Sequence, residues 1–178
     1  MPDSLDAQPG LPRGARLGVD VGKARIGLAA SDPDGLIATP VETVPRVLDG
    51  GGAAPGPVTA DVARIVAEAA DRFAAVVYVG LPRHLSGAEG AATADARGFA
   101  GLLAAALAAA GERAQVRLVD ERMTTVTAHQ ALYASGRKGR KHRSVIDQAA
   151  AVIILQSALD AERASGGRAG ELVEVQRA

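Results

Sequence analysis

Hydrophobic and polar positions alternate over short stretches near the start of the chain, and this pattern predicts strands. Residues 16–20 and 25–31 form two such stretches, and Gly22 lies in the turn between them. A third stretch, residues 36–44, alternates in part. We expect these three strands to open the fold as an antiparallel meander.

Longer periodic segments follow, and they alternate between helix and strand. After a loop, residues 58–72 repeat apolar residues with the period of an amphipathic helix, as at Val62 and Ile65. The remaining segments are a strand at 75–79, a helix at 91–110, a strand at 116–120, and helices at 124–135 and 145–163. A meander followed by this alternation predicts an α/β fold, with a mixed sheet and helices on both of its faces.

The composition indicates one domain with a segment of different character at each end. A chain of 178 residues with 48% hydrophobic content can build a single core. Residues 1–14 are rich in Pro, Asp and Gly and are predicted to be a disordered lead-in, whereas residues 164–178 are predicted to be a flexible tail. The domain itself is expected to span residues 15–163.

Composition also excludes several classes of site. Aromatic residues make up 2% of the chain and there is no Trp, which argues against an aromatic base-stacking platform. The absence of Cys excludes disulfides and thiolate metal sites. No signal peptide and no apolar stretch long enough to span a bilayer are recognisable, so we expect a cytoplasmic protein. The formal net charge is zero, so the overall charge gives no argument for nucleic acid.

Positive charge is nevertheless concentrated in one segment, GRKGRKHR at residues 136–143. Its basic residues are Arg137, Lys138, Arg140, Lys141 and Arg143. Two glycines keep the segment flexible, and binding to phosphate groups is one interpretation. A solvated, mobile loop is the ordinary alternative for such a run.

Three acidic residues interrupt or end apolar segments. They are Asp20 in LGVDVG, Glu121 in VRLVDERMTT and Asp147 in RSVIDQAAAVIILQ. A buried charge is costly unless a positive partner meets it. If folding brings the three together, a hard divalent cation such as Mg²⁺ is the obvious partner, since it takes oxygen ligands and substrate phosphates. Phosphodiester chemistry is therefore the first hypothesis.

Asp20 and Glu121 each have a local alternative. Asp20 could cap the turn that follows it, although Lys23 and Arg25 nearby supply charge for a phosphate or a carboxylate. Glu121 could simply end a strand before the helix expected from residue 124. Asp120 lies beside Glu121, and alternation sends the two carboxylates to opposite faces, so only one can easily face Asp20.

Asp147 has the strongest competing explanation. Ser144 and Asp147 match the Ser-x-x-acidic pattern of a helix N-terminus, where the acid would satisfy backbone donors. The helix behind it is apolar on nearly every side, which indicates packing between other elements. Ala150 and Ala151 are small enough to let this end of the helix approach the sheet closely.

Taken together, these segments resemble a known family. DVGKARIGLAASD, VGLPRHLSG, DERMTT and Asp147-x-x-Ala150-Ala151 with ILQ occur in the order and spacing of the YqgF family of bacterial pre-16S ribosomal RNA nucleases, also described as Holliday-junction-resolvase-like. The resemblance runs over about residues 16–159. It implies a ribonuclease H-like fold and carries the family's acidic site onto Asp20, Glu121 and Asp147, as catalytic residues and metal ligands. Related nucleases commonly use four carboxylates and this chain offers three, so the sequence does not decide between a site for one metal ion and a site for two.

The resemblance implies a metal-dependent nuclease that processes the 5′ end of pre-16S ribosomal RNA with Mg²⁺ or Mn²⁺. Its partners would be precursor RNA and ribosomal precursor particles, bound as a monomer or a homodimer. The nucleic acid would be bound by Lys23, Arg25, Arg122, Arg137, Lys138, Arg140, Lys141 and Arg143. Two alternatives are a Holliday-junction DNA endonuclease and a non-catalytic ribosome-assembly or transcription factor. Actin-like ATPases share the fold and a similar first phosphate loop, but they need two such domains, and this chain has room for one.

Overall fold

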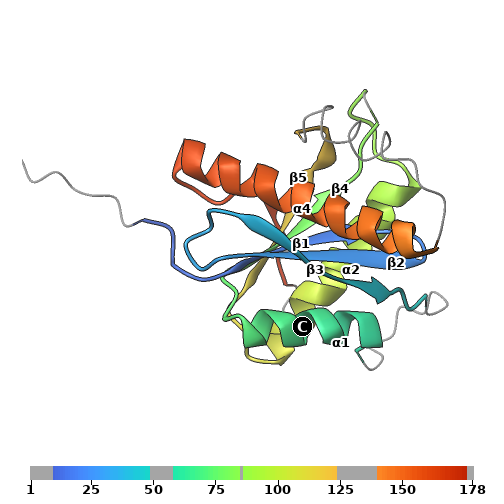
Figure 1. Cartoon of the computed structure of the whole chain (residues 1–178), viewed down its shortest axis with the longest axis horizontal. Helices are drawn as coiled ribbons and strands as arrows, with labels where there is room; N and C mark the ends of the chain where they lie inside the picture. The colour runs from blue at the N-terminus through green and yellow to red at the C-terminus, as the bar shows by residue number, and fades with distance from the viewer. Residues whose placement is uncertain (1–9, 49–57, 85, 124–139, 176–178) are drawn as a thin grey trace, which may run out of the picture.

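Six strands form one mixed sheet in the order β3-β2-β1-β4-β5-β6. Figure 1 labels the first five of them. The computed structural model describes residues 10–48, 58–84, 86–123 and 140–175, without the side chains of residues 123 and 140–144. The strands are β1 Arg16–Val21, β2 Arg25–Ser31, β3 Ala38–Pro45, β4 Val76–Leu81, β5 Gln115–Asp120 and β6 Glu171–Leu172. The first three pair antiparallel, as the expected meander. β1, β4 and β5 run parallel.

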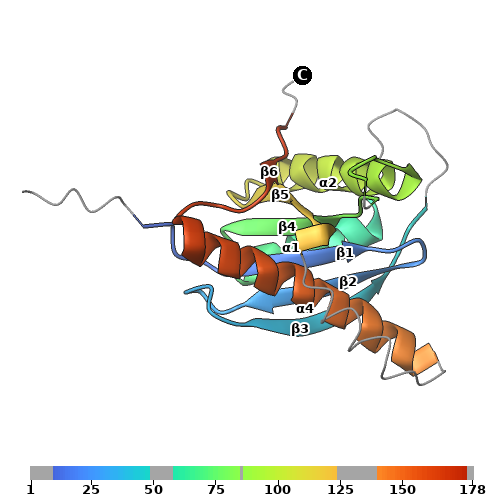
Figure 2. The same ribbon diagram turned by 90° about the horizontal axis from the view of Figure 1, so that it is seen from above.

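Helices cover both faces of the sheet, as predicted (Figure 2). α1, Ala60–Asp71, and α2, Ala91–Ala109, pack on one face, and α4, Arg140–Ser165, crosses the other. Each face has its own apolar cluster: Leu17, Val19 and Leu118 belong to the α1/α2 cluster, whereas Tyr78 and Val119 belong to the α4 cluster. β4 lies in the middle and is buried along its whole length, which explains its continuous apolar run.

The predicted elements agree with the structure except near the C-terminal helix and beyond. The predicted helix at 124–135 lies outside the described residues. The last helix begins at Arg140 rather than at residue 145. The segment 136–143 was expected to be a loop, but its residues 140–143 are helical. Residues 140–143 are basic and have no periodic apolar residues, so their sequence gave no sign of a helix. The helix that packs on the sheet further along the chain continues towards the N-terminus to include them.

The segment after the domain was predicted to be a flexible tail, yet part of it completes the sheet. β6 pairs antiparallel with β5, with Leu172 opposite Arg117 and Glu171 opposite Leu118. Arg117 donates to the carbonyl oxygens of Ala169 and Gly170 at 2.6 and 2.8 Å. A two-residue strand has no detectable alternation, so the sequence pattern could not reveal it. At the other end, the amide of Gly14 donates to Pro33, so the last residue of the predicted lead-in contacts the domain.

A buried polar cluster fixes the C-terminal half of α4 to the sheet. Glu162 is 5% exposed, and its carboxylate accepts hydrogen bonds from Arg16, Arg168 and the hydroxyl of Tyr78. Burial, followed by the hydrogen bond to Glu162, raises the pKa of the Tyr78 phenol well above its usual value. The cluster lies at the end of the sheet where β1 begins, and therefore opposite the end that carries Asp20.

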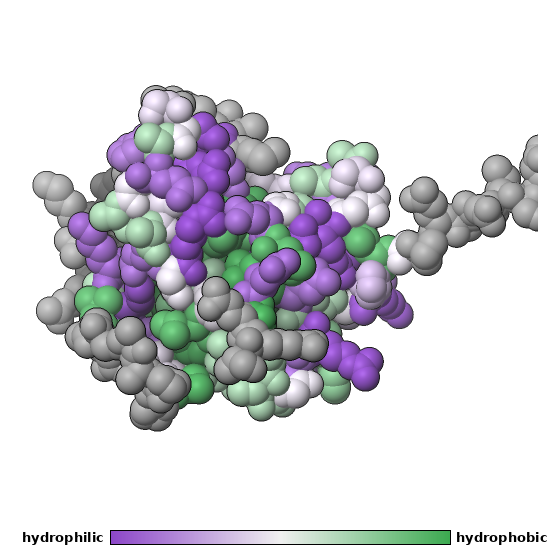
Figure 3. All heavy atoms as spheres, turned by 180° about the vertical axis from the view of Figure 1, so that it is seen from behind, coloured by the Kyte–Doolittle hydropathy of each residue, from purple (hydrophilic) through white to green (hydrophobic). Residues whose placement is uncertain are grey.

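The outer surface is mixed in character. Figure 3, seen from behind, shows hydrophilic residues gathered over the upper part of this face and hydrophobic residues near its centre and in its lower part. Within the described ranges, no helix is long and apolar enough to cross a membrane.

Candidate functional site

The ends of β1, β4 and β5 meet at one edge of the sheet. β1 and β4 run in register up to Val19 opposite Val79, and β4 pairs with β5 up to Leu81 opposite Asp120. Asp20 is the next residue of β1, and Glu121 directly follows β5 in a short 3₁₀ turn, Glu121–Met123. Because the carboxyl ends of parallel strands are where α/β sheets place their ligands, this edge is the candidate site.

Asp20 and Glu121 lie on the face of the sheet that α4 covers. A Cβ added to Gly18 would meet Leu155 of α4 at 2.6 Å, and Asp20 shares the face of Gly18 because it is two residues further along the strand. A Cβ added to Gly80 would lie 2.5 Å from Ile154 of α4 and 2.9 Å from Oε1 of Glu121. The glycines therefore leave space in which the helix and the Glu121 carboxylate both pack onto the sheet.

Asp120 is held by other partners. Its carboxylate pairs with Arg122 at 2.6 Å, and Nη1 of Arg83 lies 4.0 Å from it. The preceding alternate residue, Leu118, belongs to the α1/α2 cluster. The sequence left the choice between Asp120 and Glu121 to family resemblance, and the geometry now gives a physical reason: Glu121, not Asp120, packs beside α4 on the face of Asp20.

Asp147 reaches the same end of the sheet from α4. The backbone of Asp147 lies directly over β2, since a Cβ on Gly27 would come within 1.9 Å of the Asp147 carbonyl oxygen. Gly27 is the antiparallel partner of Asp20. The space beside Gly27 is filled by the backbone of α4. The three acidic residues thus come from three different elements to one edge and one face.

The helix-cap explanation for Asp147 is wrong. α4 begins at Arg140, so Asp147 is seven residues into the helix, about two turns beyond the first amides. The backbone donors that a capping acid satisfies are confined to the first turn. Its carboxylate instead forms an ion pair with Arg25 of β2, with Nε 2.9 Å from Oδ2.

The two neighbouring carboxylates at the end of β5 differ in their electrostatics. Burial raises the pKa of Glu121, and the charge of Asp120 adds to this effect. The hydrogen bond from Arg122 is the main cause that lowers the pKa of Asp120. A buried carboxylate with a raised pKa gains from a nearby positive charge, which is the property expected of a cation ligand.

The side chains do not form a closed ligand shell in this conformation. No group of three or more Asp, Glu, His or Cys side chains in the described ranges is close enough to hold a metal ion. Asp147 faces Arg25, so its carboxylate would have to leave that ion pair to join Asp20 and Glu121 around a cation. The donor set still fits, since three carboxylates share one glycine-lined face and hard divalent cations prefer oxygen.

The residues predicted to bind phosphate differ in their surroundings. Lys23 is exposed in the turn between β1 and β2, whereas Arg25 and Arg122 form ion pairs with acidic residues of the edge. Arg137 and Lys138 lie outside the described residues. Arg140, Lys141 and Arg143 belong to the first turns of α4, and their side chains lie outside the described part of the chain.

Sequence reasoning missed two contributors to this edge. The Glu121 carboxylate lies beside Gly80, in the space that a side chain would fill there. Arg83 lies beside Asp120. Gly80 and Arg83 both belong to the segment VGLPRHLSG, and a glycine near the end of an otherwise apolar strand was the available signal.

Comparison with known proteins identifies the family. A model of the RuvX family, described as Holliday junction resolvase, matches residues 14–161. The chain belongs to the RuvX family. RuvX is the YqgF family under another name, so the expected membership is confirmed.

Relatives match over nearly the whole chain. A protein of Clavibacter michiganensis subsp. michiganensis (strain NCPPB 382) is 58% identical over 160 residues, which cover 90% of this chain and 91% of that protein. A protein of Streptomyces coelicolor (strain ATCC BAA-471 / A3(2) / M145) is 56% identical over 167 residues, covering 94% and 92%. Both are named "Putative pre-16S rRNA nuclease".

A solved structure supports the fold. T. thermophilus RuvC in complex with Holliday junction substrate superposes with a TM-score of 0.51 at 18% identity, over 90% of this chain and 99% of that chain. The predicted ribonuclease H-like fold of this RuvX family member is thereby confirmed.

Proposed function

We propose that this protein is a metal-dependent nuclease that processes the 5′ end of pre-16S ribosomal RNA in the cytoplasm, on ribosomal precursor particles. The observation that carries the proposal is the position of Asp20, Glu121 and Asp147. They come from β1, the end of β5 and α4 to one edge and one face of the sheet. The names of relatives that are more than half identical over nearly the whole chain support RNA as the substrate.

Asp20, Glu121 and Asp147 would hold Mg²⁺ or Mn²⁺. When bound, such an ion supplies Lewis-acid stabilisation of the phosphoryl oxygens and an activated water. Burial raises the pKa of Glu121, and a bound cation would favour its charged form. No covalent protein nucleophile is required.

Arg25 has two roles in this proposal. In the present conformation its guanidinium neutralises Asp147. When Asp147 turns towards Asp20, the guanidinium is released at the same edge, where it can donate paired hydrogen bonds to a phosphate. Lys23 in the neighbouring turn and the basic segment 137–143 would bind the backbone of the RNA further away. Such contacts make binding salt-dependent and weakly sequence-specific.

The test is cleavage of precursor 16S RNA with Mn²⁺ by Asp20→Asn. We expect cleavage to fall by ~100-fold or more, since even indirect partners of metal ligands cost 10–100-fold when lost. Asp34→Asn is the matched control: Asp34 pairs with Arg13 at the opposite end of the sheet and should cleave like the wild type. Wild-type cleavage by Asp20→Asn would refute the site.

DNA junction cleavage is the second candidate. The family description and the structural likeness to RuvC favour it. Parallel assays on a four-way DNA junction and on precursor 16S RNA would separate the two. Faster cutting of the junction under matched salt and Mn²⁺ would assign the edge to DNA, whereas specific cutting at the 5′ end of the RNA would assign it to RNA processing. A non-catalytic assembly factor would cut neither.

A further inference from the structure

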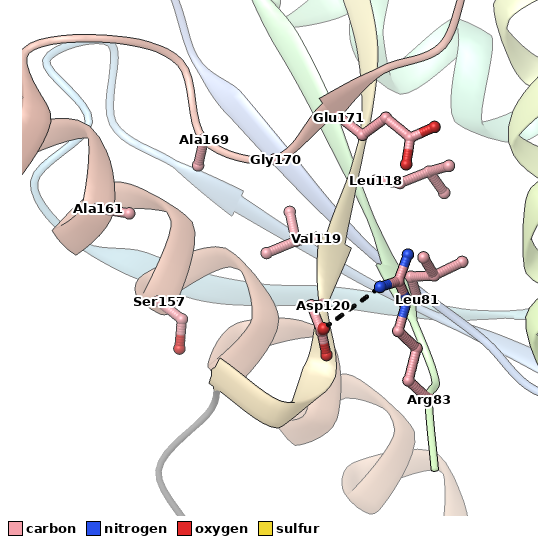
Figure 4. A pocket seen from close by; sticks show the side chains of 10 residues that line it. All are labelled: Leu81, Arg83, Leu118, Val119, Asp120, Ser157, Ala161, Ala169, Gly170 and Glu171. Carbon is pink, nitrogen blue, oxygen red and sulfur yellow. Dashed lines mark ion pairs between the residues drawn. The ribbon is translucent and has the colours of Figure 1, made fainter. Parts of the chain in front are cut away.

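A cavity of about 230 Å³ lies beside the end of β5, next to the candidate site (Figure 4). Leu81 and Val119 supply apolar wall from the sheet, and Ala161 of α4 supplies it from the helix. Arg83 and Asp120 lie together on the side nearest the candidate site, and their side chains approach one another. Glu171, in β6, closes the other side.

The rim is polar but not strongly negative. Asp120 is paired with Arg122 at 2.6 Å, and Glu171 is paired with Arg97 at 3.1 Å. Arg83 and Arg97 in turn share Glu89. Three arginines therefore balance three carboxylates, and a polyanion would not be repelled from this rim.

The size and lining suit a single flat ring. Pockets that enclose drug-sized ligands measure roughly 300–1,000 Å³, so this cavity has room for one nucleobase rather than a larger molecule. RNA-binding proteins stack unpaired bases on aromatic rings or on arginine guanidinium planes. The chain has few aromatic residues, and Arg83 offers such a plane at the cavity mouth.

The rim also presents a hydrogen-bond acceptor. Each Glu171 carboxylate oxygen accepts one long bond from Arg97, at 3.1 and 3.3 Å. An ionised carboxylate has about four acceptor positions and no donor, so Glu171 can accept from a further amino group. Adenine, cytosine and guanine carry an exocyclic amino group, and uracil does not.

We propose that this cavity holds one unstacked nucleobase of the RNA, adjacent to the phosphate that is cut, and that Glu171 selects bases with an exocyclic amino group over uracil. The position relative to the cut rests on the proposed nuclease function. The binding of a base in the cavity can be tested without any cleavage.

Binding is tested by titrating the full chain with AMP, CMP, GMP and UMP at millimolar concentration while following the methyl resonances of Val119 and Ala161. We expect shifts with the first three nucleotides and affinities about tenfold weaker for UMP, the lower value of one hydrogen bond to a charged acceptor. Ala161→Leu should fill the cavity and weaken binding about tenfold. Ala164→Leu is the matched control, since Ala164 is exposed on α4 and does not line the cavity. Equal binding by Ala161→Leu and wild type would overturn the proposal.

Glu171→Gln provides a second variant that should fold normally, because the Glu171 side chain is 58% exposed. The amide adds a donor in place of an acceptor, so the preference for CMP over UMP should disappear. An unchanged preference would refute the role of Glu171.

Cleavage gives a separate readout. RNA randomised around the cut should be cut by the wild type with fewer uracils at one flanking position, and Ala161→Leu should remove this bias while cleavage persists. An identical bias in both proteins would contradict the proposed base site. Failure of the wild type to cut RNA would instead refute the proposed function and leave the mononucleotide result intact.

Discussion

Replacement of Gly27 by alanine tests how closely α4 approaches the sheet. The added methyl would lie 1.9 Å from the Asp147 carbonyl oxygen and 2.5 Å from its carbonyl carbon. Ordinary contacts of this kind are above 3.4 Å, so the helix backbone would have to move by more than 1 Å. A backbone cannot rotate away as a long side chain can. Both α4 and the strand are tied into the core, so the strain has no easy release.

The expected magnitude follows from two opposing terms. Overpacking of a tight contact costs about 1–3 kcal/mol, and a clash with backbone belongs at the upper end of that range. Replacing glycine in a regular element otherwise gains about 0.5–1 kcal/mol through the unfolded chain. We therefore expect Gly27→Ala to lower the free energy of unfolding by about 1–2 kcal/mol.

Gly98→Ala provides a matched control in α2. Apart from its chain neighbours and the backbone of its own helix, no atom lies within 4 Å of the position of its added Cβ, and the residue is exposed. Alanine should raise the free energy of unfolding by about 0.5–1 kcal/mol, because it is the better helix former. Urea denaturation of the wild type and both variants measures the difference. A Gly27→Ala protein as stable as Gly98→Ala would refute the close packing of α4 on β2.

The same variant reports on the site. Moving α4 outwards carries Asp147 away from Asp20 and Glu121, so calorimetric Mn²⁺ binding should weaken in Gly27→Ala and stay unchanged in Gly98→Ala. If Gly27→Ala is destabilised but binds Mn²⁺ as tightly as the wild type, the close packing of α4 stands and the ligand role of Asp147 is contradicted.

Three further changes have definite expected outcomes. Arg25→Gln frees Asp147 from a partly exposed ion pair of the kind that contributes about 0.2–1 kcal/mol. If Arg25 and the metal ion compete for Asp147, calorimetry should show Mn²⁺ binding up to about fivefold more tightly to the variant. Weaker binding would contradict this competition. Tyr78→Phe removes a donor from the buried Glu162 carboxylate and should cost about 1–3 kcal/mol in urea denaturation, whereas a neutral effect would show that the hydroxyl is dispensable. Asp32 accepts hydrogen bonds from three backbone amides, and these lower its pKa, with Ile37 having the largest effect. A carboxyl group whose pKa is lower in the folded than in the unfolded protein stabilises the fold above its unfolded pKa. This stability is lost as the pH falls through its folded pKa. Asp32→Asn should therefore be less stable than the wild type at pH 7, with the difference shrinking under acid, and a constant difference would refute this assignment.

The fold was predictable where an element has its own period. The meander, α1, α2 and the two parallel strands each carry an apolar pattern long enough to show alternation or helical repeat, and each lies within a few residues of its predicted position. β6 could not be predicted, because two residues have no period and their place is decided by the free edge of β5. The start of α4 was missed for a related reason: the turns from Arg140 are polar and basic, and only the packing of later residues makes them helical.

The candidate site was predictable as a set of residue types but not as an arrangement. Sequence reasoning identified Asp20, Glu121 and Asp147 as carboxylates in apolar surroundings, but each had a local explanation that only distances could test. The ion pair between Arg25 and Asp147 joins residues 122 positions apart, and no local pattern reports such a contact. The length of α4 removed the cap explanation for Asp147, since an acid two turns into a helix has no free amide to satisfy.

Gly80 helps to determine which of the two neighbouring carboxylates, Asp120 or Glu121, lies on the face of the candidate site. Adjacent residues at a strand end point to opposite faces, so their roles depend on what covers each face. On one side Arg122 and Arg83 neutralise Asp120, which holds it as part of an ion-pair network. On the other side, the missing side chain of Gly80 leaves room for both the Glu121 carboxylate and Ile154 of α4. Burial raises the pKa of Glu121, and the pairing of a lowered and a raised pKa on neighbouring residues is typical of functional sites. Gly80→Ala would therefore push the Glu121 carboxylate out of this position and weaken Mn²⁺ binding while leaving Asp120 paired, and equal Mn²⁺ affinity in the variant would show that the glycine serves only the packing of α4.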